Sequence, residues 1–189
     1  KTAIDSNIVT KLKEKYQKEF PKGTPLVCAC EKRRFEDVKL LITGYNDVNG
    51  SNGNNNNMTL KEYVNQVGKD SRGWEVTPLQ AATGQAIIDY LFSILLDGIT
   101  RNTNTLTDLY KNAFPKGTPI VCACEKGRFE DVKLLITGRN NDVNGSNGNN
   151  NNNMTLKEYV NQVGKNSNGY DRTPLIAATD QAIIDYLFS

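Results

Sequence analysis

The chain has 189 residues, of which 38% are hydrophobic, and its 23 basic and 21 acidic residues give a net charge of +2. Because the two signs are mixed along the chain, the concentrated basic face that nucleic-acid binding requires is not expected. No apolar run approaches the roughly 18 to 20 residues of a membrane span. We therefore expect neither a nucleic acid nor a membrane as the partner.

The sequence contains an internal duplication. Residues 20–93 align with residues 114–189, with two extra asparagines in the second copy, and about ten of roughly 74 aligned positions differ. We expect an N-terminal helix over 1–19, a first repeat unit over 20–93, bridging helices over 94–113, and a second unit over 114–189. The sequence begins without methionine and stops within a helical pattern, which predicts a monomeric fragment of a longer protein.

Each unit opens with a predicted helix pair. In the first unit a helix is expected over 24–32, with Thr24 as its cap, Pro25 in its first turn and one buried apolar stripe. The second helix of the pair is expected over 34–44, where Gly44 is a C-terminal stop. Because two short helices cannot bury both apolar faces alone, each pair needs neighbours.

An Asn-rich insertion over 46–58 follows the first helix pair. Its composition carries no apolar groups to offset the entropy of ordering, which predicts a flexible, solvent-facing loop. A helix is then expected over 58–68, because Thr59 and Glu62 form a capping box pattern. After a loop over 69–76, the Thr77-Pro78-Leu79 sequence begins a shortened helix pair, repeated over 173–188 in the second unit.

The segment TPIVCACEKGRFEDVKLLITG over 118–138, followed by NDVNG, closely resembles the ankyrin repeat family. The resemblance implies an all-α, ankyrin-like helical solenoid of stacked antiparallel helix pairs, here with long inserted loops. One departure concerns the histidine that follows the Thr-Pro-Leu motif in this family, because no histidine occurs in the chain. Its place is taken by Val27, Gln80, Val121 and Ile176, and we expect looser hairpin loops as a result.

Ankyrin repeats typically bind other proteins through their hairpin tips and inner helices, so the resemblance implies a non-catalytic protein–protein interaction module. The differences between the copies concentrate before the shortened helix pairs, where Trp74 and Tyr170 are candidate anchors. Alternatively, exposed loops vary freely and these aromatic rings cover a neighbouring repeat. The candidate partner-binding residues are Tyr45, Arg72, Trp74, Glu75 and Gln80 in the first unit, and Arg139, Tyr170, Asp171 and Arg172 in the second.

The sequence lacks the usual patterns of catalytic and cofactor sites. Without histidine, a phosphate-binding loop or a base beside a cysteine, we expect no catalytic residues, no cofactor and no metal. Cys28 and Cys30, like Cys122 and Cys124, are separated by one alanine, so on a helix they point about 200° apart. This favours apolar packing in a reducing, cytoplasmic compartment over a disulfide.

Other functions remain open on the sequence alone. The chain could be a structural spacer in a longer repeat array that binds nothing else. The asparagine runs are typical of AT-rich genomes and leave open a host-directed effector, as a variant of the binding module. A thiol or metal sensor is a further hypothesis, and it requires the four cysteines to be exposed.

Overall fold

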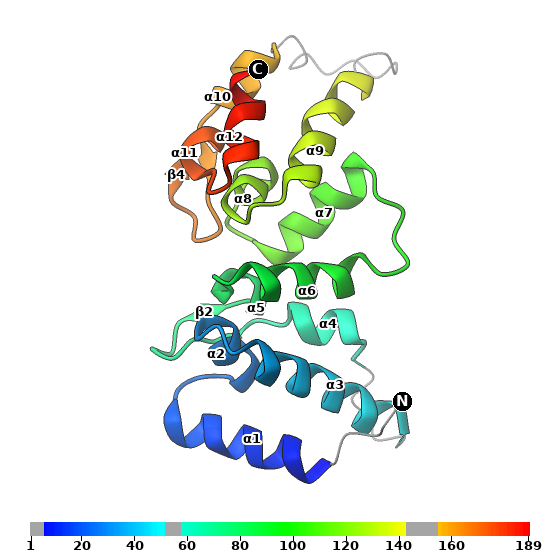
Figure 1. The fold of residues 1–189 in the computed structure, drawn as a ribbon, viewed down its shortest axis with the longest axis vertical. Helices are drawn as coiled ribbons and strands as arrows, with labels where there is room; N and C mark the ends of the chain where they lie inside the picture. Colours follow the sequence, from blue (N-terminus) through cyan, green and yellow to red (C-terminus); the bar gives the residue numbers. More distant parts are fainter. Residues whose placement is uncertain (1–5, 52–57, 143–154) are drawn as a thin grey trace. The chain divides into compact units, whose positions relative to one another are not determined.

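The computed structural model describes residues 6–51, 58–142 and 155–189, and this part of the chain is mostly helical, with two short two-stranded ribbons (Figure 1). The chain divides into two compact units, unit 1 over Lys1–Asp97 and unit 2 over Gly98–Ser189. None of the described helices has both the length and the apolar character needed to cross a membrane. The strands correct the all-α prediction in a small part of each unit.

The two units contain the same elements in the same order. In unit 1 these are α1 (Ser6–Glu19), α2 (Pro25–Glu31), α3 (Phe35–Ser51), α4 (Leu60–Asn65), β1 (Gly68–Lys69), β2 (Glu75–Val76), α5 (Pro78–Ala81) and α6 (Gln85–Leu96). In unit 2 they are α7 (Thr103–Ala113), α8 (Pro119–Glu125), α9 (Phe129–Asp142), α10 (Leu156–Asn161), β3 (Gly164–Lys165), β4 (Asp171–Arg172), α11 (Pro174–Ala177) and α12 (Gln181–Phe188).

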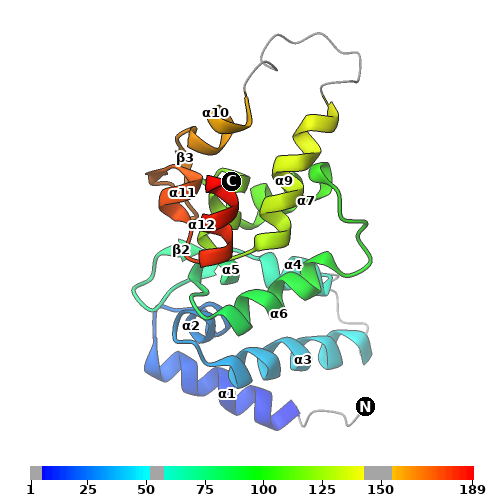
Figure 2. The same ribbon diagram turned by 45° about the horizontal axis from the view of Figure 1, so that its top comes forward.

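The first helix of each unit is an integral part of that unit. In Figures 1 and 2, α1 lies along α3, and α7 makes the equivalent contacts with α8 and α9. The Tyr16 hydroxyl donates to Asp37 Oδ2 at 2.8 Å, and the Tyr110 hydroxyl donates to Asp131 Oδ2 at 2.9 Å. The predicted bridging helices over 94–113 are therefore revised, because 94–96 ends α6 in unit 1 and 103–113 forms α7 in unit 2.

Helix α2 is the most completely buried element of unit 1. Five consecutive residues, Leu26 to Cys30, are buried, because α1, α3, α5 and β1 all contact this helix. The prediction of a single buried stripe was wrong for this helix, and α8 repeats the arrangement with Ile120 to Cys124. A short helix that is apolar on all sides thus lies at the centre of each unit.

Helix α3 continues past the glycine that was predicted to end it. Gly44 is buried inside the helix, where an added Cβ would lie 2.4 Å from Val9 Cγ2 of α1. Its small size allows α1 and α3 to approach closely, and it does not act as a C-cap. The helix takes up residues 46–51 of the predicted Asn-rich loop, while 52–57 and the tract over 143–154 lie outside the described residues.

The capping box predicted for Thr59 and Glu62 is confirmed, but α4 ends at Asn65, before the predicted end of the helix. Gly68 instead begins β1, which pairs with β2 in an antiparallel hairpin through Gly68↔Val76 and Lys69↔Glu75. The same hairpin in unit 2 joins β3 to β4. The shortened helix pair is confirmed as α5 and α6, and as α11 and α12.

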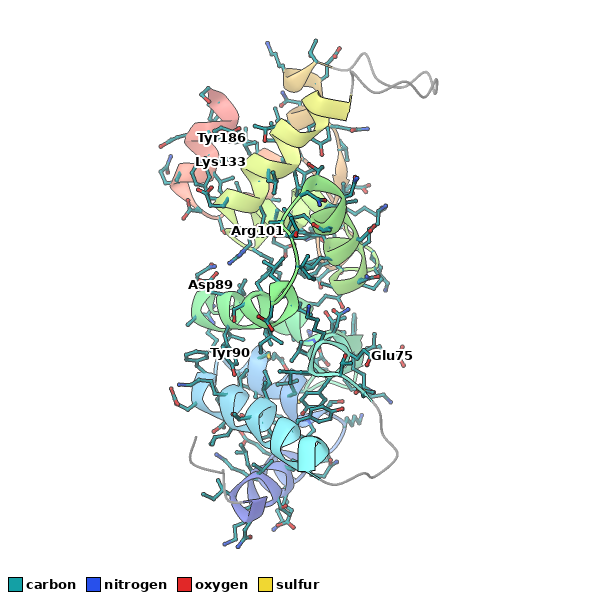
Figure 3. All side chains as sticks on the ribbon, turned by 90° about the vertical axis from the view of Figure 1, so that its right-hand side faces the viewer. Glu75, Asp89, Tyr90, Arg101, Lys133 and Tyr186 are labelled. Carbon is teal, nitrogen blue, oxygen red and sulfur yellow. The ribbon has the colours of Figure 1, made fainter. Side chains whose placement is uncertain are left out.

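Aromatic contacts join the long helices of each unit in the same way. The rings of Phe35 and Tyr90 meet edge to face with centroids 5.7 Å apart, and those of Phe129 and Tyr186 lie 5.6 Å apart. Lysine ammonium groups cover the phenylalanine rings, and Figure 3 shows Lys133 beside Tyr186. Edge-to-face pairs of this kind add to the stability gained by burial.

The copies differ in backbone strain between their first paired helices. Arg33 has a φ of 57°, and its counterpart Gly127 has a φ of 64°. A left-handed conformation costs an L-residue about 1–2 kcal/mol and costs glycine little. The Arg33 side chain recovers part of this cost, because its Nε donates to Thr83 Oγ1 at 2.9 Å.

We expect Arg33→Gly to raise the free energy of unfolding by about 1 kcal/mol and Gly127→Arg to lower it by a similar amount, because the strain is removed or introduced. Urea unfolding followed by circular dichroism measures both changes. A Thr83→Ala control isolates the contribution of the hydrogen bond. Equal stability of the three Arg33 and Gly127 forms would contradict this explanation.

Candidate partner-binding surface

Strand β1 lies directly on α2 and leaves no space between the two backbones. The Thr24 N–H donates to the Lys69 carbonyl at 2.8 Å, and the Lys69 N–H donates to Thr24 Oγ1 at 2.9 Å. A Cβ added to Gly68 would lie 2.9 Å from Val27 Cγ2. Thr24 was predicted as a side-chain cap of α2, but its hydroxyl makes no capping bond and instead binds the hairpin.

The turn of the hairpin is held by two carboxylates. Glu31 accepts the Ser71 N–H and the Ser71 hydroxyl, both at 2.9 Å. Asp70 is buried, and its Oδ1 accepts the Arg72 and Trp74 N–H groups, both at 2.9 Å. The turn backbone is therefore fixed from both sides.

We name Thr24, Val27 and Glu31 the hairpin seat, and unit 2 has the same seat in Thr118, Val121 and Glu125. Its distances match: the Lys165 N–H lies 2.9 Å from Thr118 Oγ1, and Glu125 accepts Ser167 at 2.7 and 2.8 Å. The expectation of looser hairpin loops was wrong, because Thr and Glu side chains supply the bonds that histidine supplies in ankyrin repeats.

The hairpin tips display aromatic side chains. Trp74 is 66% exposed and Tyr170 is 63% exposed, so neither ring covers a neighbouring repeat. Arg72 donates to Asp70 Oδ2 through Nε at 3.1 Å and Nη2 at 2.7 Å, and its guanidinium lies 5.4 Å from the Trp74 ring centroid. In unit 2 the Asn166 side-chain oxygen makes the same turn bonds as Asp70 without carrying a charge.

The other predicted residues of the tips are also exposed. Glu75 lies on β2, and in Figure 3 it is on the side of unit 1 opposite Asp89 and Tyr90. Asp171 and Arg172 form β4, and Asp171 Oδ1 accepts a 2.9 Å bond from Lys165 Nζ. The structure thus brings Arg72, Trp74 and Glu75 together on one hairpin, and Tyr170, Asp171 and Arg172 on the other.

Three predicted site residues do not lie on the hairpins. Gln80 begins α5, where its Oε1 accepts the Thr77 N–H at 2.7 Å and completes a capping box. Tyr45 stacks on Tyr63 with centroids 3.9 Å apart and donates to the Met58 carbonyl at 2.8 Å, so it joins α3 to α4. Arg139 belongs to α9, but its side chain lies outside the described part of the chain.

The cysteines do not meet the requirement of the thiol-sensor hypothesis. All four are free and fully buried. Burial raises the pKa of the Cys28 thiol to about 11 and that of the other three thiols to about 12. Since the thiolate is the reactive form, these thiols are inert. Within the described ranges, no three Cys, Asp or Glu side chains are grouped so that they could hold a metal ion.

Sequence reasoning missed the seat because its partners are distant in the chain. Glu31 and Ser71 are separated by 40 residues, and neither belongs to a local motif. One signal was available, since the Thr, Val, Glu and Ser of the seat contacts are identical in the two copies while the exposed tip residues differ. That contrast distinguishes the residues that hold the hairpin from those that it displays.

The Glu31 clamp predicts a pH dependence. Burial alone would raise the Glu31 pKa, but the Ser71 backbone and hydroxyl bonds, with Lys32, hold it below its ordinary value of 4.5. Because the folded-state pKa is lowered, the stabilisation is present above pH 4.5 and is lost as pH falls through the folded pKa. We expect the Ser71 amide NMR signal to shift in that acidic range. A Glu31→Gln variant serves as the control, and a shift that persists in this variant would exclude Glu31 as the cause.

Comparison with family models, curated proteins and solved structures gives no significant match to this chain. Residues that carry the ankyrin-like motif, such as Thr118 and Pro119, and the geometry of the two hairpins are therefore the basis for the proposal of function.

Proposed function

We propose that this chain is a non-catalytic protein-binding module of the ankyrin-like type, whose units stack helix pairs as a solenoid and hold a partner at the hairpin tips. The main support is the exposure of Trp74 and Tyr170 on hairpins whose backbones are bonded to α2 and α8. Large exposed rings normally carry an unfavourable hydration cost, which a binding partner removes.

The fixed backbone of the tip favours binding. Asp70 and Glu31 hold the turn before any partner arrives, so little conformational entropy remains to be lost on association. Trp and Tyr rings lose few rotatable bonds when they are buried. Rigid backbones that display aromatic anchors are the usual composition of interface hot spots.

The tip chemistry also suits a protein surface. Arg72 lies against the Trp74 ring and is already bonded to Asp70, so its guanidinium is oriented before contact. Tryptophan, tyrosine and arginine are the residues most enriched in protein interfaces. A host-directed effector would use the same surface, and it differs from a cellular scaffold only in the identity of the partner.

The ankyrin-like arrangement is supported by contacts inside each unit. The short central helices touch one another, α2 with α5 and α8 with α11, while the longer helices α3 and α6 pair through Phe35 and Tyr90. Hairpins project beside the short helices. This separation of short inner helices from longer outer ones is the arrangement that the resemblance implies.

We expect a Trp74→Ala, Tyr170→Ala double variant of the full chain to lose a partner that the parent captures from lysate of the source organism. Truncating one hot-spot anchor costs about 2 kcal/mol or more, which is about thirtyfold in affinity. The measurement is affinity capture, followed by titration of the captured protein against the parent and both single variants. The single variants show which hairpin contributes.

Ile8→Ala is the matched control, because Ile8 is an exposed apolar residue on α1, away from both tips. All variants must keep the helical circular dichroism of the parent. Undiminished capture by the double variant would contradict binding at the tips. If no specific partner is captured at all, the structural spacer becomes the better explanation.

A further inference from the structure

The spacing of the hairpin seat recurs once more in unit 2. The seat on α8 consists of a threonine, an aliphatic residue three positions later and an acidic residue seven positions later. Starting from Thr173, the same spacing gives Ile176 on α11 and Asp180 at the start of α12. In unit 1 the corresponding residues are Thr77, Gln80 and Gly84, which lack the aliphatic and the acidic member.

In the occupied seat each member has a defined task. Thr118 exchanges two backbone-directed hydrogen bonds with Lys165, and Val121 packs under Gly164, where an added Cβ would lie 2.9 Å from Val121 Cγ2. Glu125 accepts the backbone N–H and the hydroxyl of Ser167. The hairpin covers Val121 completely, since its exposure is 0%.

The second set has the same side chains but no hairpin over it. Ile176 is 67% exposed, and Asp180 is also exposed. The Asp180 Oδ1 atom accepts the Ala182 and Ile183 N–H groups, which leaves Oδ2 for another donor. Thr173 Oγ1 accepts the Ile176 N–H at 3.3 Å, and a hydroxyl oxygen has a second acceptor position.

The isoleucine is locally unfavourable where it stands. In unit 1 the Gln80 side chain accepts the Thr77 N–H and completes a capping box, whereas Ile176 has no acceptor to offer the Thr173 N–H. Unit 2 therefore gives up a cap bond and exposes an aliphatic side chain to water at the same position. Local rules are typically broken in this way where a surface serves binding.

We propose that Thr173, Ile176 and Asp180 form a second seat, which binds a β-hairpin of a partner protein with the pattern Gly-Lys-x-Ser-x-Gly. The glycine faces Ile176, because any Cβ there would meet the isoleucine as it would meet Val121. The backbone of the next residue bonds Thr173, and the serine of the partner donates to Asp180. This surface goes beyond the proposed function, since it includes neither Trp74 nor Tyr170.

Unit 1 does not offer this surface. Gln80 is bonded to Thr77 within its own capping box, and Gly84 has no carboxylate for a serine donor. Two of the roughly ten differences between the copies thus create the second seat in unit 2 alone.

The test is a titration of the ¹⁵N-labelled full chain with a synthetic peptide of the sequence of residues 162–172, closed through a D-Pro–Gly turn to hold the hairpin. We expect saturable shifts of the amides from Thr173 to Asp180. Ile176→Gln should weaken binding at least about tenfold. This variant restores the capping-box residue of unit 1, so it is expected to fold. A peptide with Gly164→Val should not bind, because valine cannot approach Ile176.

Absence of saturable shifts at α11, or equal binding by the parent and Ile176→Gln, would overturn the second seat. Concentration-dependent shifts of the same amides without peptide would assign the surface to a second copy of this chain and overturn the partner assignment. The Trp74→Ala, Tyr170→Ala variant should bind the peptide normally. This result separates the second seat from binding at the tips, so either proposal can fail alone.

Discussion

The close approach of Gly68 to Val27 is the contact on which the rest of unit 1 depends. Since a Cβ at Gly68 would lie within 2.9 Å of Val27 Cγ2, the strand reaches the helix only with glycine at this position. That approach brings Lys69 within hydrogen-bonding distance of Thr24 and places Ser71 over Glu31. The turn is fixed as a consequence, and α2 becomes buried on every side.

This constraint separates the residues that hold the hairpin from those that it displays. The holding groups are buried or bonded on both sides, and their loss would leave polar groups of the turn unpaired. The displayed side chains, Trp74 above all, contribute little to the fold because they project into water. Tip residues can therefore change between copies without altering the hairpin, as the exchange of Asp70 for Asn166 demonstrates: one acceptor oxygen is enough for the turn.

Local interactions account for what could be predicted from the sequence. The box of Thr59 and Glu62 was found because both partners lie within one helical turn. The hairpin was missed because two-residue strands carry no alternation of apolar and polar residues. Tyr45 was misplaced for a related reason, since Tyr63, on which it stacks, comes from a different helix beyond the Asn-rich insertion. Gly44 matched a stop signal, but its role is set by Val9 of α1.

The two units are close in sequence but are not equivalent surfaces. A duplicated unit needs the same contacts to fold, so the seat residues of α2 and α8 must satisfy the same geometry twice. No such requirement applies at Gln80 and Ile176, where either residue leaves the preceding threonine at the start of its helix. Glutamine there closes the helix start with a hydrogen bond, and isoleucine keeps an apolar face in water. A single exchange thus moves free energy from local stability to a surface that gains only when something covers it.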